Sequence, residues 1–396
     1  MLFGAIADDY TGGSDLAGML AERGVRTLMH FGVPNEPLRG DYDAAVVCLK
    51  SRSIDPGEAR AMSARALAWL QSAGARQIQF KYCSTFDSTA RGNIGPVLDE
   101  LLERMNVPSV VAVPALPVNG RTQYLGHLFV NGVPLAESPM RHHPLNPMTD
   151  SNLVRHLAAQ TKSPVGLMAI TTVQQGAAAI RRVLAGSNAR MLLVDAICES
   201  DLAHIAEAVV DTPLLSGGSG IAAHLPAFWS TRAPIAAPAP IEPSGVAMIA
   251  GSCSTATIEQ VRRYEGAFGP AVRFDAPESA PEQLDRTGRV LISSSAPPER
   301  RLPLASAGAI ERALARVAVD MVEQHGVRRL IVAGGETAGA VVDALGIKAV
   351  EVVRVLSPGV PALRSLGAHP IAMVLKSGNF GGPEFFSEAA AYLETL

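Results

Sequence analysis

The chain has 396 residues, of which 48% are hydrophobic and 18% are charged, and its formal net charge is −3. This length exceeds one ordinary hydrophobic core and predicts two domains, while the apolar content excludes a disordered chain. The nearly balanced charge gives no basic surface for nucleic acid or for an anionic membrane.

The N-terminus, MLFGAIADDY, has no basic segment, and its apolar run is too short for a signal peptide. No apolar run reaches the roughly 18 residues of a membrane-spanning helix. The four cysteines lie far apart, without a C-x-x-C pair or the spacing of a zinc site. We therefore expect a cytoplasmic protein with reduced thiols, which binds neither nucleic acid nor membrane.

Short apolar strands, polar or glycine-rich turns and amphipathic helices alternate from the start of the chain. The first such unit is LFGAIA at 2–7, DDYTGGSD at 8–15 and LAGMLAERG at 16–24. Further buried strands are predicted at 43–49, 77–82, 107–116, 165–170 and 190–197. This alternation predicts a mostly parallel sheet covered on both faces by helices.

A stretch rich in proline and alanine at 226–244 lacks both the helical and the strand period. It predicts an N-terminal domain at 1–228, a linker at 229–244 and a C-terminal domain at 245–396. The α/β pattern resumes after it, with strands at 245–251, 327–333 and 372–376. Residues 270–305 are weakly patterned apart from a strand at 289–294. Both domains are therefore predicted to be α/β, each a largely parallel sheet flanked by helices.

The turn after the first strand contains Asp8, Asp9 and Thr11. Ligands of open parallel sheets bind beyond the carboxyl ends of the strands. Two adjacent carboxylates there suit magnesium, a substrate hydroxyl or proton abstraction, and Thr11 and the glycines leave N–H groups for an anion. A solvated turn with a helix cap is the alternative interpretation.

A second polar turn, KYCSTFDST at 81–89, offers a cation, a carboxylate and several hydroxyl groups. A polyhydroxylated acid needs this mixture, since its carboxylate requires a cation and its hydroxyls require polar partners. A shorter basic cluster, KSRS at 50–53, follows the preceding strand. We predict that substrate is bound by side chains from these two turns and by Arg91, which follows the longer one; the candidates in the turns are Arg52, Lys81, Ser84, Thr85 and Asp87. A solvated loop is the alternative for each turn.

Residues 119–150 are predicted to form a long ordered loop, since prolines punctuate them, and such loops are often lids or binding loops. Arg121, in the NGRT segment, is a further candidate substrate ligand. His142 and His143 are adjacent and have no third ligand at metal spacing. We assign no metal-ligating residues.

Three glycine-rich turns follow strands in the C-terminal half: GSCS at 251–254, GGET at 334–337 and SGNFGG at 377–382. Backbone N–H groups at such strand–helix turns bind phosphate. No segment matches the P-loop or the Rossmann fingerprint. The three turns together predict a nucleotide-phosphate site in this domain.

These segments, in this order, resemble the four-carbon acid sugar kinase family over nearly the whole chain. The segments that carry the resemblance are DDYTG, KYCSTFDST with RGNIGP, NGRT, GGSG, GSCS, AGGET, LSPGVP and KSGNFGG. The loop SPMRHHPLNPMTDSNLV at 138–154 is most similar to the 3-oxo-tetronate kinase branch. The resemblance implies that the N-terminal domain binds a sugar acid and the C-terminal domain binds ATP. It implies ATP contacts at Ser254, Gly334, Gly335, Glu336, Thr337 and Gly378, and substrate contacts at the Asp8–Asp9 turn, Arg52 and residues 81–87.

As a mechanism, we expect transfer of the γ-phosphoryl group of ATP to the 4-hydroxyl of the acid, with Mg²⁺ bridging the phosphates. Asp9 or Asp87 would accept the hydroxyl proton, and Asp9 is preferred. Arg52, Lys81 or Arg91 would pair with the substrate carboxylate. Closure of the domains across the linker would exclude water. A D-threonate or D-erythronate kinase, and a regulator that binds nucleotide or sugar acid without catalysis, stay open as alternatives, as does a homodimer.

Overall fold

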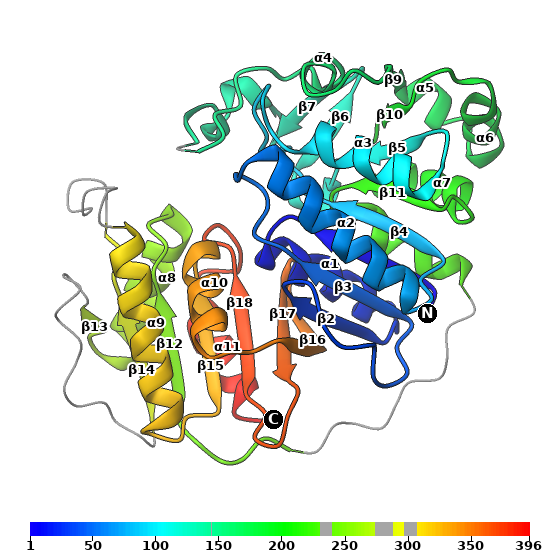
Figure 1. Cartoon of the computed structure of the whole chain (residues 1–396). Coiled ribbons are helices and arrows are strands. Elements are labelled where there is room, and N and C mark those ends of the chain that lie inside the picture. Colours follow the sequence, from blue (N-terminus) through cyan, green and yellow to red (C-terminus); the bar gives the residue numbers. More distant parts are fainter. Residues whose placement is uncertain (144, 230–239, 274–287, 297–306) are drawn as a thin grey trace. The chain divides into compact units, whose positions relative to one another are not determined.

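The computed structural model describes residues 1–143, 145–229, 240–273, 288–296 and 307–396 (Figure 1). The chain forms two compact units, residues 1–233 and 234–396. Most of the predicted linker, residues 230–239, lies outside the described residues, as does much of the weakly patterned stretch at 270–305. Within the described ranges, no helix is both long enough and apolar enough to cross a bilayer.

The first unit is built on a sheet in which all neighbouring strands are parallel. Its strand order is β2 (Thr27–Phe31), β3 (Ala44–Cys48), β1 (Phe3–Ala7), β4 (Gln77–Lys81), β11 (Leu214–Gly217), β5 (Val110–Val113), β10 (Met191–Val194) and β9 (Val165–Met168). Its helices are α1 (Tyr10–Glu22), α2 (Pro56–Ser72), α3 (Ile94–Met105), α4 (Leu153–Ala158), α5 (Ile170–Val173), α6 (Ala177–Gly186) and α7 (Glu199–Val209). Short 3₁₀ turns lie at Pro117–Asn119, Leu135–Glu137, Pro139–His142, Gly220–Ala223 and Leu225–Phe228.

The central strands of this sheet are buried on both faces, which explains their continuous apolar sequences. Every residue of β1, β3 and β4 is buried. Helices α2 and α3 pack together on one face, and α1, α6 and α7 cover the other. Helix α2 begins at Pro56 because the Asp55 carboxylate caps it, accepting from the N–H groups of Gly57 and Glu58, and because proline is favoured in the first turn.

A second, small antiparallel sheet replaces the first part of the loop predicted at 119–150. It contains β6 (Arg121–Tyr124), β7 (His127–Val130) and β8 (Val133–Pro134). The prediction of a loop was wrong here because two-residue hairpin turns were overlooked. Leu125–Gly126 and Asn131–Gly132 all have positive φ, and Asn-Gly is a strong hairpin signal. The remainder, residues 138–150, forms an ordered loop with one 3₁₀ turn, and residue 144 lies outside the described residues.

The second unit is also α/β, with a mixed sheet. Its strand order is β13 (Val272–Arg273), β14 (Arg289–Ser293), β12 (Val246–Ala250), β15 (Arg329–Ala333), β18 (Ala372–Lys376), β17 (Val360–Ser365) and β16 (Ala349–Ser357). The pairs from β13 to β18 are parallel, whereas β17 is antiparallel to both β18 and β16. Its helices are α8 (Thr255–Phe268), α9 (Ala307–Glu323), α10 (Gly335–Ala344) and α11 (Phe385–Leu393). Helices α9 and α10 pack together on one face, while α8 and α11 pack on the other (Figure 1).

The predicted fold class is thus confirmed: both units are sheets flanked by helices. The strand orders also bring predicted turns together. In the first unit β3, β1, β4 and β11 are neighbours, and in the second unit β12, β15 and β18 are neighbours. Because parallel strands end at the same edge of a sheet, the polar turns that follow them lie side by side.

Candidate active site

In the first unit, the turns after β1, β3 and β4 are joined by backbone hydrogen bonds. The Asp8 N–H donates to the Lys81 carbonyl over 3.0 Å, and the Ser51 N–H donates to the Asp8 carbonyl over 3.0 Å. Asn93, at the start of α3, fixes the turn after β3, since its side-chain amide donates to the carbonyls of residues 51, 52 and 54. Turns distant in sequence therefore form one rigid edge.

Arg52 holds the acidic doublet. Its Nε and Nη2 donate to the two oxygens of Asp8 over 2.9 and 2.8 Å, and Nη2 also reaches Asp9 Oδ1 at 2.5 Å. The Nη1 atom lies 3.7 Å from Asp87 Oδ2. Bidentate pairing of this kind is strong and directional. The Arg52 charge is therefore shared among three carboxylates of the protein itself.

Asp9 has an environment that favours its ionised form. Burial by itself would raise its pKa, but the charges of Arg52 and Lys81 and a hydrogen bond from Thr11 outweigh burial and lower the pKa. The Thr11 hydroxyl donates to Asp9 Oδ2 over 2.8 Å. The structure thus brings Thr11, Asp9 and Lys81 together, as the sequence predicts.

Lys81 is the second cation of this cluster, and it differs from Arg52. Its side chain is only 3% exposed. Among the described residues its ammonium has neither a hydrogen bond nor an ion pair, although its charge lowers the pKa of Asp9. Gly12 makes room for it, since a Cβ at Gly12 would lie 2.8 Å from Lys81 Nζ and 2.2 Å from Asp9 Oδ1. A buried ammonium without a partner needs an anion or polar ligand to offset its desolvation.

The segment after Lys81 completes the polar edge. Thr85 donates to Asp87 Oδ1 over 2.7 Å, and both side chains are buried. The Cys83 thiol lies 2.9 Å from the Thr85 hydroxyl, and burial raises its pKa to about 12, so it is a neutral thiol at neutral pH. Ser84 is half-buried and lies against the Gly218 turn after β11.

A fourth acidic residue, Asp15 on α1, was missed as a site residue because it resembles a helix-cap residue. It is 5% exposed, its Oδ2 accepts from the Ser219 hydroxyl, and its Oδ1 has no partner among the described residues. Burial raises its pKa, although Lys81, Ser219 and Arg121 oppose this effect. Arg121 therefore lies within electrostatic range of the cluster, on the small sheet.

Arg91 is not placed with the other candidates. Its side chain is exposed, and its backbone N–H donates to the Thr89 hydroxyl. In contrast, the loop at 138–150 does approach the basic turn. The Asn146 amide, which is 6% exposed, donates to the Ser53 hydroxyl over 2.9 Å, next to Arg52.

In the second unit, the three glycine-rich turns meet. Ser254 caps α8, and its hydroxyl accepts from the Thr257 N–H and donates to the Gly378 carbonyl over 2.6 Å. The Gly334 N–H donates to the Lys376 carbonyl, and the Ser252 N–H donates to the Ala333 carbonyl. Gly334 precedes α10 with φ of +128°, which favours glycine. N-terminal N–H groups of two helices therefore point toward one edge.

The remaining nucleotide candidates begin α10. Gly335 and Glu336 are exposed in its first turn, while Thr337 is buried against Gly251. Lys376, which ends β18 and is fully buried, was not among the predicted ATP contacts. The scarcity of lysine in this chain was the available signal. The N–H groups at the start of α10, which no side chain caps, and the nearby hydroxyls form a set of donors that fits a polyphosphate.

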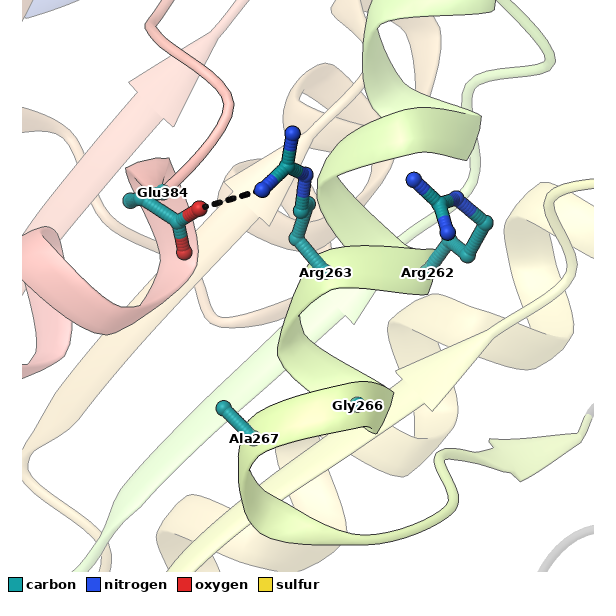
Figure 2. Close-up of a pocket in the computed structure, with 5 residues that line it drawn as sticks. All are labelled: Arg262, Arg263, Gly266, Ala267 and Glu384. Carbon is teal, nitrogen blue, oxygen red and sulfur yellow. Dashed lines mark hydrogen bonds and ion pairs between the residues drawn. The ribbon is translucent and has the colours of Figure 1, made fainter.

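A shallow depression of about 330 Å³ lies elsewhere in the second unit, on the C-terminal half of α8 (Figure 2). It is lined by Arg262, Arg263, Gly266, Ala267 and Glu384. Gly266 follows Ser254 by twelve helical residues, or about 18 Å of helix. Both arginines pair with Glu259, and Arg263 also reaches Glu384 at 3.4 Å. Its positive charge is thus already balanced, and we assign it no ligand.

Two family models match the chain, one for each unit. A model described as a sugar-binding N-terminal domain matches residues 3–225, and one described as a nucleotide-binding C-terminal domain matches residues 247–386. A relative from Pseudomonas fluorescens, named 3-oxo-tetronate kinase, is 45% identical, and the match covers 99% of this chain and 97% of the relative.

Solved structures resemble the whole chain as well. One from Salmonella typhimurium LT2, described as a candidate tRNA synthase, has a TM-score of 0.86 and 38% identity, covering 98% of each chain. One from Haemophilus influenzae has a TM-score of 0.81 and 40% identity, covering 98% of this chain and all of the other.

Proposed function

Because the chain belongs to the four-carbon acid sugar kinase family, we propose that it transfers the γ-phosphoryl group of ATP to the 4-hydroxyl of a four-carbon sugar acid. Its substrate is 3-oxo-tetronate, the acid that names the relatives sharing 40–45% identity with nearly the whole chain. The first unit binds the acid, and the second unit binds the nucleotide.

The observation that carries the proposal is the contrast between the two cations, half-buried Arg52 and buried Lys81. Arg52 is occupied by Asp8, Asp9 and Asp87, whereas Lys81 has no partner among the described residues. Lys81 is therefore the cation that binds the substrate carboxylate, and Arg52 orients the acidic groups. Arg91, exposed and outside the cluster, is not needed for this role.

Asp9 is the base. It is ionised and partly exposed, and it is held by Arg52 and Thr11 on one side. It accepts the proton of the C4 hydroxyl as that oxygen attacks the γ-phosphorus and ADP leaves. Asp87 is tied to Thr85 and faces Arg52, so it positions rather than accepts the proton.

The nucleotide phosphates bind at the turns of Ser254, Gly334 and Gly378, as the donor geometry favours. Mg²⁺, if bound with the phosphates, would supply positive charge against the transferring group. Within the described ranges, no cluster of three or more acidic, histidine or cysteine side chains could cage a metal ion. Mg²⁺ usually needs only one or two protein carboxylates beside substrate phosphates, and Glu336 on α10 would supply one.

Coupled ADP release with Mg-ATP tests the proposal against four acids: 3-oxo-tetronate, D-threonate, D-erythronate and L-threonate. Strong turnover on 3-oxo-tetronate alone supports both the reaction and the substrate. Turnover on D-threonate or D-erythronate instead would support the kinase reaction and contradict the assignment of 3-oxo-tetronate as substrate. Binding of ATP without turnover of any acid would favour a regulator that binds its ligands without catalysis.

A further inference from the structure

Lys376 is a buried cation in the second unit that the proposed mechanism does not use. It is completely buried at the end of β18. Its ammonium donates to the Thr257 hydroxyl at 3.0 Å and to the carbonyls of Ser377 and Gly378 at 3.2 and 3.1 Å. Among the described residues, no carboxylate pairs with it. Such a charge is costly to bury, so a purely structural role would be served better by an apolar residue.

One acceptor of this ammonium, the Gly378 carbonyl oxygen, accepts three hydrogen bonds. The Gly378 oxygen accepts from Lys376 Nζ and also from the hydroxyls of Ser254, at 2.6 Å, and Thr257, at 2.8 Å. A carbonyl has two lone pairs, so three donors fix its direction firmly. Gly378 is required here, because a Cβ would lie 2.1 Å from the Ser252 hydroxyl oxygen.

A fixed carbonyl also fixes the N–H of the next residue. The peptide bond between Gly378 and Asn379 is trans and planar, so the Asn379 N–H points opposite to the Gly378 oxygen. It therefore points away from Lys376 and Thr257. Asn379 is exposed, and its N–H has no acceptor among the described residues. It is an oriented donor beside the start of α8.

We infer that Lys376 is a positioning residue for the nucleotide: it locks the Gly378–Asn379 peptide so that the Asn379 N–H donates to a nucleotide phosphate. Lys376 does not touch the phosphate, because its side chain is buried and its nitrogen is directed to the oxygens of Thr257, Ser377 and Gly378. This inference rests on the proposed nucleotide site of the second unit. It adds the Asn379 N–H as a phosphate donor and Lys376 as the residue that orients it.

The test uses the full chain and direct titration with ATP, without any sugar acid. Lys376→Met has a similar length and no donors, and Lys348→Met, at an exposed lysine of the same unit, is the matched control. We expect Lys376→Met to raise the Kd for ATP about 10-fold, the effect of losing one hydrogen bond, and to leave the KM for the acid unchanged. An ATP Kd within about twofold of the wild type overturns the inference.

A second pair of variants covers the case in which Lys376→Met fails to fold. Thr257→Val removes another donor to Gly378 at nearly constant volume, and Thr257→Ser keeps it, so only the valine variant should weaken ATP binding. In protein labelled with ¹⁵N-asparagine, ADP should shift the Asn379 amide signal, identified by its loss in Asn379→Gln. An unmoved signal contradicts the inference. ATP binding with these effects, but without turnover of any acid, would refute only the proposed reaction.

Discussion

Lys81 is the cation that we expect to bind the substrate carboxylate, and its removal tests this role. Lys81→Met removes a charge that makes no hydrogen bond or ion pair among the described residues, so the ion pairs of Arg52 with the carboxylates remain. We expect the KM for the acid to rise about 10-fold or more, while the Kd for ATP is unchanged. Steady-state kinetics and ATP titration measure both quantities. Lys162→Met, at an exposed lysine of the same unit, is the control. Equal acid KM values for Lys81→Met and wild type would remove Lys81 from the site.

Asp9→Asn keeps the size of the side chain and an oxygen for Thr11, but it cannot accept the proton. We expect kcat to fall about 10²- to 10⁴-fold, the usual contribution of a general base, with ATP binding retained. Because the pKa of Asp9 is lowered, the base is ionised at neutral pH, and activity should be lost only as pH falls through that lowered pKa. An Asp87→Asn variant should be less impaired. Near-normal turnover by Asp9→Asn would show that another group accepts the proton.

Lys376 also makes stability depend on pH. Burial lowers its pKa in the folded protein to about 7, against 10.5 for an unperturbed lysine. Between these values the unfolded chain holds the proton and the folded chain does not, so stability rises with pH, by up to about 1.4 kcal/mol per unit. The penalty is fully present below pH 7. Lys376→Met lacks it, so its gain in stability over wild type should shrink as pH rises from 7 to 10. Chemical denaturation of both proteins at each pH measures this difference in the free energy of unfolding. A difference that does not change with pH would contradict the prediction.

The strands and helices could be predicted from the hydrophobic pattern of the sequence, because that pattern follows from which faces of each element are buried. Strands such as β1 and β4 are covered on both faces, so their sequences are continuous apolar runs ended by polar turns. Since parallel strands share an edge, the predicted turns had to meet. The hairpins β6–β7–β8 were missed because their strands have only two to four residues, too few for a clear alternation, and because their two-residue turns were overlooked. The partner of each side chain, such as Arg52 with Asp8 instead of a ligand, depends on packing that no local pattern contains.

The loop at 138–150 is the element that we expect to set acid preference. Its Asn146 amide reaches Ser53 beside Arg52, so the loop supports the turn that orients the acidic doublet. Asn146→Ala should change the ratio of kcat/KM between 3-oxo-tetronate and D-threonate about 10-fold, at unchanged ATP Kd. Asn188→Ala, at an exposed asparagine of the same unit, is a control. If kcat/KM falls equally for both acids, the loop supports the fold of the site and does not select.

At the scale of the whole molecule, the division of labour between the units can be tested by combining variants. Lys81 and Lys376 lie in different units and share no hydrogen-bond partner in the described residues. Losses at independent sites add within about 0.5 kcal/mol. In the double variant Lys81→Met/Lys376→Met, acid binding should therefore match that of Lys81→Met, and ATP binding should match that of Lys376→Met. Titration of each ligand alone measures both terms. A larger deviation would mean that one unit alters the ligand affinity of the other before the ternary complex forms.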